Sequence, residues 1–351
     1  MLAAICYGKK DLRIEEVVDK PLAPNEVRVQ VAYGGICGSD MHYFHRGAVG
    51  DFAIREPLTL GHEISGWVSE VGSEAGHLRP GMKAALDPSR PCLVCERCRS
   101  GENHLCMNMF FLGSAGRFPH VQGGFSQSLV LRADQIVPVP DDTDLLSLSV
   151  AEPLSVGLHA VNRAGNLFGK RVIVTGSGPI GLLTVMSAVK AGAAEVVATD
   201  IEDAALAVAR EKMGAARTVN VRTDADGLTP FEANGGYFDV GFEASGSAAA
   251  LNSLFRIIRR GGVVVQVGML PPGEVAIPVN VLQSREINLL GSFRANKEFR
   301  QAVDLIVSRA VDVSPILSGT YALQDAVSAF ERAGDRSKVV KLHLAISEQT
   351  P

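Results

Sequence analysis

Residues 171–181 read Arg-Val-Ile-Val-Thr-Gly-Ser-Gly-Pro-Ile-Gly, and this stretch decides the fold of the chain. Its first five residues are rich in β-branched side chains and predict a short, fully buried strand. Residues 182–190 then show the apolar pattern of a helix, which Gly192 ends. A second short strand is expected at 195–199, with Asp200 at its carboxyl end. A strand, a glycine-rich turn, a helix and a second strand predict a parallel α/β unit.

The three glycines of this turn have separate physical roles. Gly176 permits the tight turn, Gly178 lets a pyrophosphate approach the backbone, and Gly181 lets the helix pack closely on the strand. The helix that follows offers free N–H groups and the positive end of its dipole to phosphates. A glycine turn alone would also fit an ordinary α/β unit, but the complete strand–turn–helix–strand pattern favours dinucleotide binding.

The acid at the end of the second strand indicates which dinucleotide is bound. Asp200 follows the first glycine by about two dozen residues, where a carboxylate accepts from the adenosine ribose hydroxyls. It would repel a 2′-phosphate, and the next three residues, Ile201, Glu202 and Asp203, add two acids and no arginine. The expected cofactor is therefore NAD. The expected cofactor-binding residues are Gly176, Gly178, Pro179, Ile180, Gly181, Asp200, Val267 and Ser292.

Length and composition set the class of protein. A chain of 351 residues, with 46% hydrophobic and 21% charged residues, suits a globular protein of two domains. Its 34 basic and 38 acidic residues argue against electrostatic binding of nucleic acid. No apolar run reaches the roughly 18 residues of a membrane span, and no signal peptide is evident. The expected location is the cytoplasm.

Four of the six cysteines form a group with metal-ligand spacing. Cys92, Cys95, Cys98 and Cys106 give the pattern C-x2-C-x2-C-x7-C. An iron–sulfur cluster of the bacterial ferredoxin type needs a last gap of three residues and a following proline, and this chain has neither. Four thiolates in one short lobe therefore predict a closed structural zinc site.

A second group of possible metal ligands is more dispersed along the chain. Residues 34–42 are expected to form a glycine-rich loop that carries Cys37, and His62 and Glu63 precede a strand. Taken alone, this cysteine and histidine fit either zinc binding or a buried thiol and a hydrogen-bonded core imidazole. Glu152 lies on an apolar background, where a carboxylate is costly unless it is paired or bound to metal.

The remaining pattern places the nucleotide domain inside the chain. Alternating strands and helices continue to about residue 292 and predict a doubly wound parallel sheet, the Rossmann type of α/β fold. The strand-like segments before residue 131 and the terminal strand at 339–344 predict a mostly β domain built from both ends of the chain. The expected bounds are 149–293 for the Rossmann domain, and 1–148 with 294–351 for the other.

These motifs together resemble the zinc-containing medium-chain alcohol and polyol dehydrogenases over nearly the whole chain. In that family a Cys-Gly-Ser-Asp-x-His loop, a Gly-His-Glu, a four-cysteine lobe and a Rossmann turn occur in this order. The segment 152–155, Glu-Pro-Leu-Ser, is similar to the sorbitol dehydrogenase branch, and segments 113–125 and 291–294 resemble the L-idonate 5-dehydrogenases most. The resemblance implies a GroES-like catalytic domain, two zinc ions per chain, and a homodimer or homotetramer.

The resemblance also implies roles for the dispersed group. Cys37 and His62 look like ligands of a catalytic zinc, with Glu63 or Glu152 as the third and one position open. Zinc would act as a Lewis acid that lowers the pKa of the substrate hydroxyl. Ser39 and His42 match the family's proton relay. The expected catalytic residues are Cys37, Ser39, His42, His62, Glu63 and Glu152.

The resemblance implies a small sugar-like substrate with a secondary alcohol. A carboxylate on such a substrate favours a planar cationic partner, and Arg294 and Arg117, with Phe118 beside it, are the candidates. Polyol dehydrogenases of the family share the Phe-Arg pair at 293–294 and usually follow it with an aromatic residue, whereas this chain has Ala295. L-Idonate, oxidised to 5-keto-D-gluconate, is therefore the expected substrate, and sorbitol or xylitol is the alternative.

Overall fold

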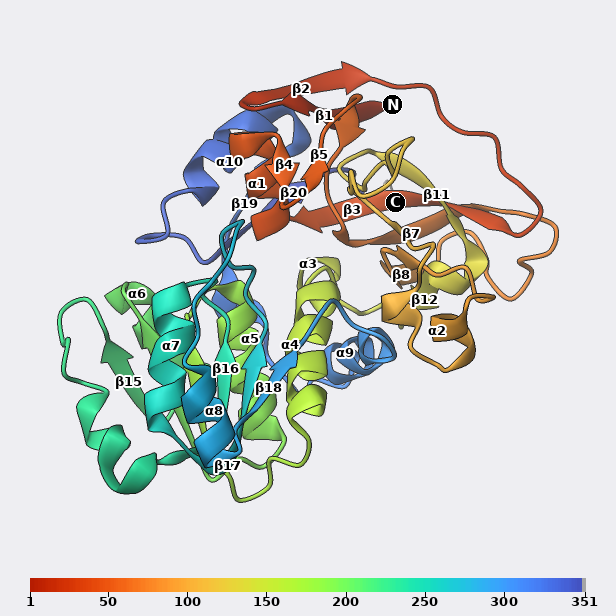
Figure 1. Ribbon diagram of the computed structural model, residues 1–351. Helices are drawn as coiled ribbons and strands as arrows, with labels where there is room; N and C mark the ends of the chain where they lie inside the picture. The colour runs from red at the N-terminus through yellow and green to blue at the C-terminus, as the bar shows by residue number, and fades with distance from the viewer. Residues whose placement is uncertain (349–351) are drawn as a thin grey trace. The chain divides into compact units, whose positions relative to one another are not determined.

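The computed structural model describes residues 1–348, which form two compact units (Figure 1). One unit comprises Met1–Glu152, Phe299–Asp335 and the chain from Lys341 onward. The other comprises Pro153–Glu298 with the short segment Arg336–Val340. The chain therefore enters the second unit after Glu152 and leaves it before Phe299.

The second unit is built on a parallel sheet. Within the described residues the sheet has six strands in the order β15-β14-β13-β16-β17-β18. Numbered by sequence this order is 3-2-1-4-5-6, which is the doubly wound Rossmann arrangement, so the predicted fold class is confirmed. The strands are β13 (Arg171–Thr175), β14 (Glu195–Asp200), β15 (Arg217–Asn220), β16 (Phe238–Glu243), β17 (Ile258–Gln266) and β18 (Asn288–Gly291).

Apolar side chains between the sheet and its helices form the core of this unit. Ile173, Val197, Phe238 and Val264 on the strands are buried together with Leu254 of a crossing helix. Continuous apolar strands are expected where helices cover both faces of a parallel sheet. The helices are α4 (Ala151–Ala164), α5 (Pro179–Lys190), α6 (Asp203–Glu211), α7 (Ala248–Ile257) and α8 (Val279–Arg285), with the 3-10 segment η3 (Thr229–Gly235).

The other unit is mostly β. Its largest sheet has the order β12-β8-β7-β3-β20-β19, and β11 also pairs with β3. The C-terminal strand β20 lies beside β3 from the N-terminal part, so both ends of the chain build one sheet. The strands are β1 (Leu2–Gly8), β2 (Asp11–Glu16), β3 (Glu26–Gly35), β4 (Ala48–Val49), β5 (Phe52–Ala53), β6 (Leu58–Thr59), β7 (Glu63–Val71), β8 (Lys83–Leu86), β9 (Ser89–Arg90), β10 (Phe110–Phe111), β11 (Ser128–Arg132), β12 (Ile136–Pro138), β19 (Leu317–Ala322) and β20 (Lys341–Ala345).

Short helices complete this unit. The elements are α1 (Gly38–Arg46), α2 (Glu96–Arg99), α3 (Leu145–Leu148), α9 (Glu298–Val307) and α10 (Ala326–Ala333), with the 3-10 segments η1 (Asn103–Leu105), η2 (Ala133–Gln135), η4 (Ser314–Ile316) and η5 (Leu323–Asp325). Among residues 1–348, no helix has the length and apolar character needed to cross a membrane.

One local expectation from the sequence was wrong. The predicted loop at 34–42 is a strand end followed by α1, whose first turn is held by the Asp40 carboxylate accepting from the backbone N–H of Cys37 at 2.9 Å. Residues 145–164 form two helices, α3 and α4, which are separated at residues 149–150, and Pro153 lies in the first turn of α4. A proline is tolerated there because the first N–H groups of a helix have no intrahelical acceptor.

Candidate metal and cofactor sites

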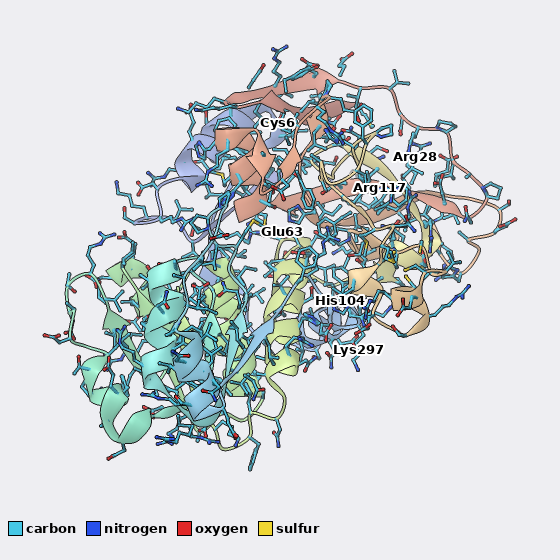
Figure 2. All side chains as sticks on the ribbon, viewed as in Figure 1. Cys6, Arg28, Glu63, His104, Arg117 and Lys297 are labelled. Atoms are coloured by element: carbon cyan, nitrogen blue, oxygen red, sulfur yellow. The ribbon has the colours of Figure 1, made fainter. Side chains whose placement is uncertain are left out.

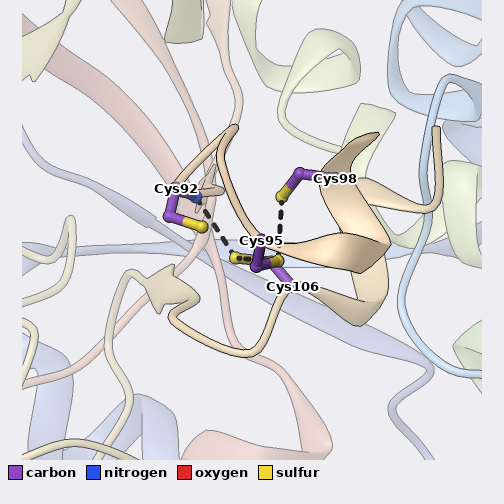
Figure 3. Close-up of side chains that lie close together, drawn as sticks. All are labelled: Cys92, Cys95, Cys98 and Cys106. Atoms are coloured by element: carbon purple, nitrogen blue, oxygen red, sulfur yellow. Dashed lines mark hydrogen bonds between the residues drawn. The ribbon is translucent and has the colours of Figure 1, made fainter. Parts of the chain in front are cut away.

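The four cysteines of the predicted structural site lie together in a short lobe (Figure 3). Their sulfur atoms all lie within 4.8 Å of one another. Sγ of Cys95 is 3.5 Å from that of Cys98 and 4.0 Å from that of Cys106. A tetrahedral site with zinc–sulfur bonds of about 2.3 Å has sulfur–sulfur edges of about 3.8 Å. The four thiols therefore have the spacing that a zinc ion requires, and none of them forms a disulfide.

Backbone donors around the lobe favour charged sulfur. The N–H groups of Cys92 and Asn108 donate to Sγ of Cys106 at 3.2 and 3.3 Å. Backbone N–H groups of Val94 and Cys95 lower the pKa of Cys92 to about 6. A thiolate is the form of cysteine that binds metal. The lobe has only α2 and η1 as regular structure, as expected from its lack of periodicity.

A second metal-ligand group is mixed and less accessible. Ligand atoms of Cys37, His62 and Glu63 also lie within 4.8 Å of one another. Cys37 precedes α1, and the other two stand at the start of β7, so the fold brings together residues from two separate segments. His62 and Glu63 are buried. One sulfur, one imidazole and one carboxylate match the donor set of a catalytic zinc with an open position.

Asp40 holds the two segments of this mixed group together. Its fully buried carboxylate accepts from the N–H of Cys37 at 2.9 Å and from the N–H of Gly61 at 3.1 Å. The same carboxylate lies 3.8 Å from Nδ1 of His62, which has no hydrogen-bond partner although it is buried. The sequence placed Asp40 in the Cys-Gly-Ser-Asp-x-His motif but did not show this positioning role. The segment that contains Gly61 and His62 comes close to Asp40 only in the folded chain.

The electrostatics of the mixed group favour a cation. Burial opposes the charge of His62, but the negative charges of Cys37 and Asp40 raise its pKa well above the usual value. Burial raises the pKa of Glu152 to about 7, and the nearby Glu63 adds to this shift. Acids that cannot all ionise in a buried space are stabilised by a proton or by a metal ion. The residues present therefore fit a metal.

A buried lysine and histidine complete the group, and sequence reasoning missed both. Nζ of Lys341 donates to Oε2 of Glu63 at 2.5 Å and to the carbonyl of Ile36 at 3.1 Å, and both charged side chains are buried. Burial opposes the charge of each partner, but their attraction lowers the pKa of Glu63 and raises that of Lys341. Burial and this lysine lower the pKa of His343 to about 3. A lysine within an apolar terminal strand was the signal in the sequence.

The sheet explains why these side chains meet. Gly35 on β3 pairs with Glu63 on β7 and with His343 on β20, so the three lie in one row across neighbouring strands. A Cβ atom on Gly35 would lie 2.2 Å from Oε2 of Glu63 and 3.2 Å from Nε2 of His343. The absent side chain therefore creates the space in which Glu63, labelled in Figure 2, reaches Lys341.

The two aromatic residues of β10 separate the metal group from a predicted substrate residue. The ring of Phe111 lies 5.4 Å from that of His62. Arg117, labelled in Figure 2, lies over the ring of Phe110 at 4.1 Å. Because neighbouring residues of a strand project to opposite faces, the arginine lies on the face away from the imidazole. Phe118 is exposed, and the guanidinium of Arg55 covers its ring.

The predicted relay residues both lie on α1, after Cys37. Ser39 is in the first turn of this helix and His42 in the second. Both side chains are partly exposed, so solvent can reach them. The helix thus carries a hydroxyl two residues after Cys37 and an imidazole five residues after it.

In the Rossmann unit, the glycine turn has the geometry that the sequence predicts. Gly176 has a φ of +88°, and a Cβ there would lie 2.7 Å from the backbone of Ser245. A Cβ on Gly181 would lie 1.8 Å from the carbonyl oxygen of Gly176. Gly178 precedes α5, which starts with Pro179 and Ile180, and a Cβ on it would meet nothing within 4 Å. The space in front of this helix is therefore open to a phosphate.

Further residues at the carboxyl edge of the sheet have unfilled hydrogen-bonding capacity. Oγ of Ser292 and Oε1 of Gln266 are buried without a partner, and the N–H of Ser292 donates to the Gln266 carbonyl at 2.9 Å. Val267 lies beside them, half-buried. Orphaned polar atoms at the edge where ligands of such sheets bind fit a dinucleotide.

A buried acid that sequence reasoning missed organises this edge. The carboxylate of Glu243 accepts from the backbone and hydroxyl of Ser245, from the N–H of Gly246 and from Nε2 of Gln266. It therefore joins the loop that follows β16 to the last residue of β17. After β18, Arg294 has a left-handed φ of +57° and lies over the ring of Phe293.

Comparison with protein families identifies both parts of the chain. Residues 23–141 match the alcohol dehydrogenase GroES-like domain, and residues 179–308 match the zinc-binding dehydrogenase domain.

Individual proteins match over nearly the full length. The chain is 40% identical to L-idonate 5-dehydrogenase (NAD(P)(+)) of Escherichia coli strain K12, covering 97% of this chain and 98% of that protein. It is 33% identical to sorbitol dehydrogenase of Bacillus subtilis, covering 95% and 93%. The crystal structure of the Escherichia coli L-idonate 5-dehydrogenase superposes with a TM-score of 0.93 at 38% identity, covering 98% of this chain and 97% of that one.

Proposed function

Because this chain belongs to the zinc-binding alcohol dehydrogenase family, we propose that it oxidises L-idonate to 5-keto-D-gluconate with NAD as hydride acceptor. The observation that carries the proposal is the buried mixed group of Cys37, His62 and Glu63 in a chain that also has a complete Rossmann edge. A hydride acceptor and a Lewis-acid site are together what oxidation of an unactivated alcohol requires.

In this proposal Cys37, His62 and Glu63 hold the catalytic metal. When bound, zinc would polarise the substrate hydroxyl and lower its pKa. Glu152 interacts electrostatically with His62 and Glu63 and would be the second acid of the site, outside the three-residue group. Asp40 lies 3.8 Å from Nδ1 of His62, and Lys341 donates to Oε2 of Glu63, so that Oε1 would be left to bind the metal. Cys92, Cys95, Cys98 and Cys106 hold the second, structural zinc.

The hydroxyl proton and the hydride leave the substrate separately. When bound, NAD would accept the hydride from the carbinol carbon, and the hydroxyl proton would have to reach solvent. Ser39 and His42 of α1 are the proposed path for that proton, since a hydroxyl followed by an imidazole can pass it outward. Both side chains are partly exposed, which supports an exit to solvent at this helix.

NAD is the proposed cofactor, because the carboxylate of Asp200 lies where the adenosine ribose binds in Rossmann domains. The related Escherichia coli enzyme is described as acting with NAD(P)(+), and a related structure at 30% identity was solved with NADP bound. A nicotinamide cofactor is thus common to both relatives, and preference for NAD is the finer expectation.

L-Idonate is proposed over a neutral polyol for two reasons. The 40% identity to an L-idonate 5-dehydrogenase exceeds the 33% identity to a sorbitol dehydrogenase. Arg294 can contact a substrate carboxylate through two hydrogen bonds, and Ala295 leaves more room than an aromatic residue. Arg117, engaged with Phe110, is the weaker candidate. Sorbitol or xylitol remains the second candidate, because sorbitol dehydrogenases are also similar over nearly the whole chain.

Steady-state kinetics with L-idonate, sorbitol and xylitol test the substrate. We expect L-idonate to have the highest kcat/KM. Arg294→Ala should reduce kcat/KM for L-idonate by roughly 30- to 1000-fold and that for the polyols far less, by analogy with truncated buried charge pairs. Arg117→Ala, the same change at the weaker candidate residue, is the matched control and should reduce kcat/KM for L-idonate less. Wild-type preference for a polyol, or equal losses for acid and polyol, would contradict the L-idonate proposal but not the fold.

We further propose a cytoplasmic homodimer or homotetramer. All six cysteines are free thiols, which is typical of a reducing compartment. Exposed apolar side chains surround the cysteine lobe at Leu93, Val94, Leu105 and Met107. Exposed apolar patches of this kind are often covered by a second subunit. Light scattering of the purified protein tests the oligomeric state, and a monomer at micromolar concentration would contradict it.

A further inference from the structure

A cation lies at the carboxyl ends of β14 and β15 in the Rossmann sheet, where the sequence did not place one. Arg222 follows β15, and its guanidinium donates to Oε1 of Glu202 at 2.8 Å. Glu202 lies two residues after Asp200, directly before α6. The sequence pattern around Asp200 showed acids and no arginine, because the arginine comes from the next strand of the sheet.

Hydrogen bonds fix the segment of Arg222 beside that of Asp200. Asp200 pairs in register with Asn220, the last residue of β15. The side-chain amide of Asn220 donates to Oδ1 of Asp203 at 2.6 Å and accepts from the N–H of Arg222 at 3.0 Å. The backbone N–H of Val221 also donates to the carbonyl of Asp200 at 3.0 Å. The arginine therefore occupies a defined place at the edge that the adenosine ribose would meet.

The carboxylate of Asp200 is itself held by the backbone. It accepts from the N–H groups of Ser177, Ile201 and Glu202 at 2.6, 2.7 and 3.0 Å. A carboxylate has about four acceptor sites, so one remains for a ribose hydroxyl. This arrangement serves a ribose with free hydroxyls and repels a phosphate on the 2′-oxygen.

The Glu202–Arg222 pair is open to competition. The side chain of Arg222 is 55% exposed and that of Glu202 24% exposed. The pair is not strong, but while it is formed the Glu202 carboxylate occupies the guanidinium donors that a phosphate dianion would need for two charge-assisted bonds. If the carboxylate were absent, the guanidinium would be free to bind an anion at this edge.

We propose that Glu202 masks Arg222, and that this ion pair determines the cofactor selectivity of the proposed dehydrogenase against a 2′-phosphorylated dinucleotide. The inference rests on the cofactor site of the proposed function. Asp200 supplies recognition of the free ribose, and Glu202 removes the cation that a 2′-phosphate would need. Arg222 is thus a latent phosphate-binding residue, which neutralisation of a single neighbour makes available.

Fluorescence titration of the zinc-loaded protein with NADPH and with NADH, without substrate, tests the inference by binding rather than turnover. Glu202→Gln should tighten NADPH binding by about tenfold, the scale of one partly exposed charge contact. The double variant Glu202→Gln/Arg222→Ala should return to the wild-type affinity. NADH affinity should change by less than about threefold in each variant.

Asp203→Asn is the matched control, because it removes an acid from the same loop without freeing the guanidinium. It should leave NADPH affinity nearly unchanged. An equal gain in this control, or a gain that persists in the double variant, would show that lost negative charge alone is responsible and would overturn the inference. Unchanged NADPH binding in Glu202→Gln with normal NADH binding would overturn it as well. If NADH bound neither the wild-type protein nor any of the variants, the proposed function would be overturned instead, and the inference with it.

Discussion

The two cysteine-containing groups of this chain differ in how they are made. The lobe of Cys92, Cys95, Cys98 and Cys106 comes from one segment of 15 residues, and three of its four cysteines are partly exposed. The mixed group joins Cys37 with His62 and Glu63, and its acid is held by Lys341 from the last strand. In the cysteine lobe, bound metal would serve in place of a hydrophobic core. The mixed group instead lies within a core that the sheet already forms.

This difference assigns separate roles to the two groups. In a lobe whose regular structure is limited to α2 and η1, between the paired strands β9 and β10, bound metal contributes directly to folding. In a buried group positioned by three strands and a helix, metal adds chemistry to a scaffold that the sheet already holds. Loss of metal should therefore unfold the cysteine lobe, whereas it should abolish activity at the mixed group without unfolding it.

The largest effect is expected from breaking the lobe. Cys98→Ala should lower the thermal stability strongly and reduce soluble yield, because structural zinc can contribute roughly 10–16 kcal/mol in small sites. Differential scanning calorimetry and metal analysis of the soluble fraction measure this effect. Cys6→Ala, a buried cysteine outside both groups, is the control for loss of a thiol. A Cys98→Ala protein of wild-type stability would show that the metal in the lobe does not support folding, and would contradict the separate roles given to the two sites.

Breaking the mixed group should affect activity instead. Cys37→Ala should lower kcat by about 10³-fold or more, since the Lewis-acid contribution is worth several kcal/mol. The variant should retain its fold and bind about one zinc per chain rather than about two. Circular dichroism, metal analysis and kinetics on one preparation decide the matter. An active variant with one zinc would mean that the mixed group is not the catalytic site.

The buried ion pair behind the mixed group gives a sharper test of its scaffold. Lys341→Met leaves Glu63 buried without its partner and should destabilise the metal-free protein by roughly 3–5 kcal/mol. The double variant Glu63→Gln/Lys341→Met should recover much of that loss, since neither charge is then left alone. Chemical denaturation of chelator-treated samples measures both. Equal stability of the single and double variants would show that the pair is not coupled.

The smallest expected effect concerns an acid that is stabilised without metal. Burial opposes the charge of Glu298, but His159, Asn162 and the N–H of Asn296 outweigh it and lower its pKa to about 2. Its native pKa lies below the unfolded value, so its stabilisation is present above about pH 4.5 and is lost as the pH falls toward 2. After allowance for solvent screening, Glu298→Gln should cost roughly 1–2 kcal/mol at pH 6.

Denaturation of wild type and Glu298→Gln between pH 3 and pH 7 checks this sign. The difference in stability should shrink toward pH 3 and should not respond to chelator. A difference that grows at low pH would contradict the assignment. Sensitivity to chelator would show that the acid belongs to the metal chemistry after all.

How far the sequence could predict each site follows from the same comparison. The cysteine spacing and the glycine turn are local patterns, so the lobe and the Rossmann edge were visible without a structure. The partners Lys341, His343 and Arg222 reach their sites through strand pairing between distant segments, and no spacing rule indicates that. Glu243 was missed for another reason, since its hydrogen bonds join the loop after β16 to the end of a different strand, β17.

The row of residues across Gly35 also sets the order in which the sites can be completed during synthesis. The cysteine lobe can bind metal soon after Cys106 leaves the ribosome. Glu63 must wait for Lys341, which lies 278 positions further along the chain. At about 5–20 residues per second, that interval is roughly a quarter of a minute to a minute. A nascent chain thus carries Glu63 without its partner for that time, and a chain truncated before β20 would lack the partner permanently.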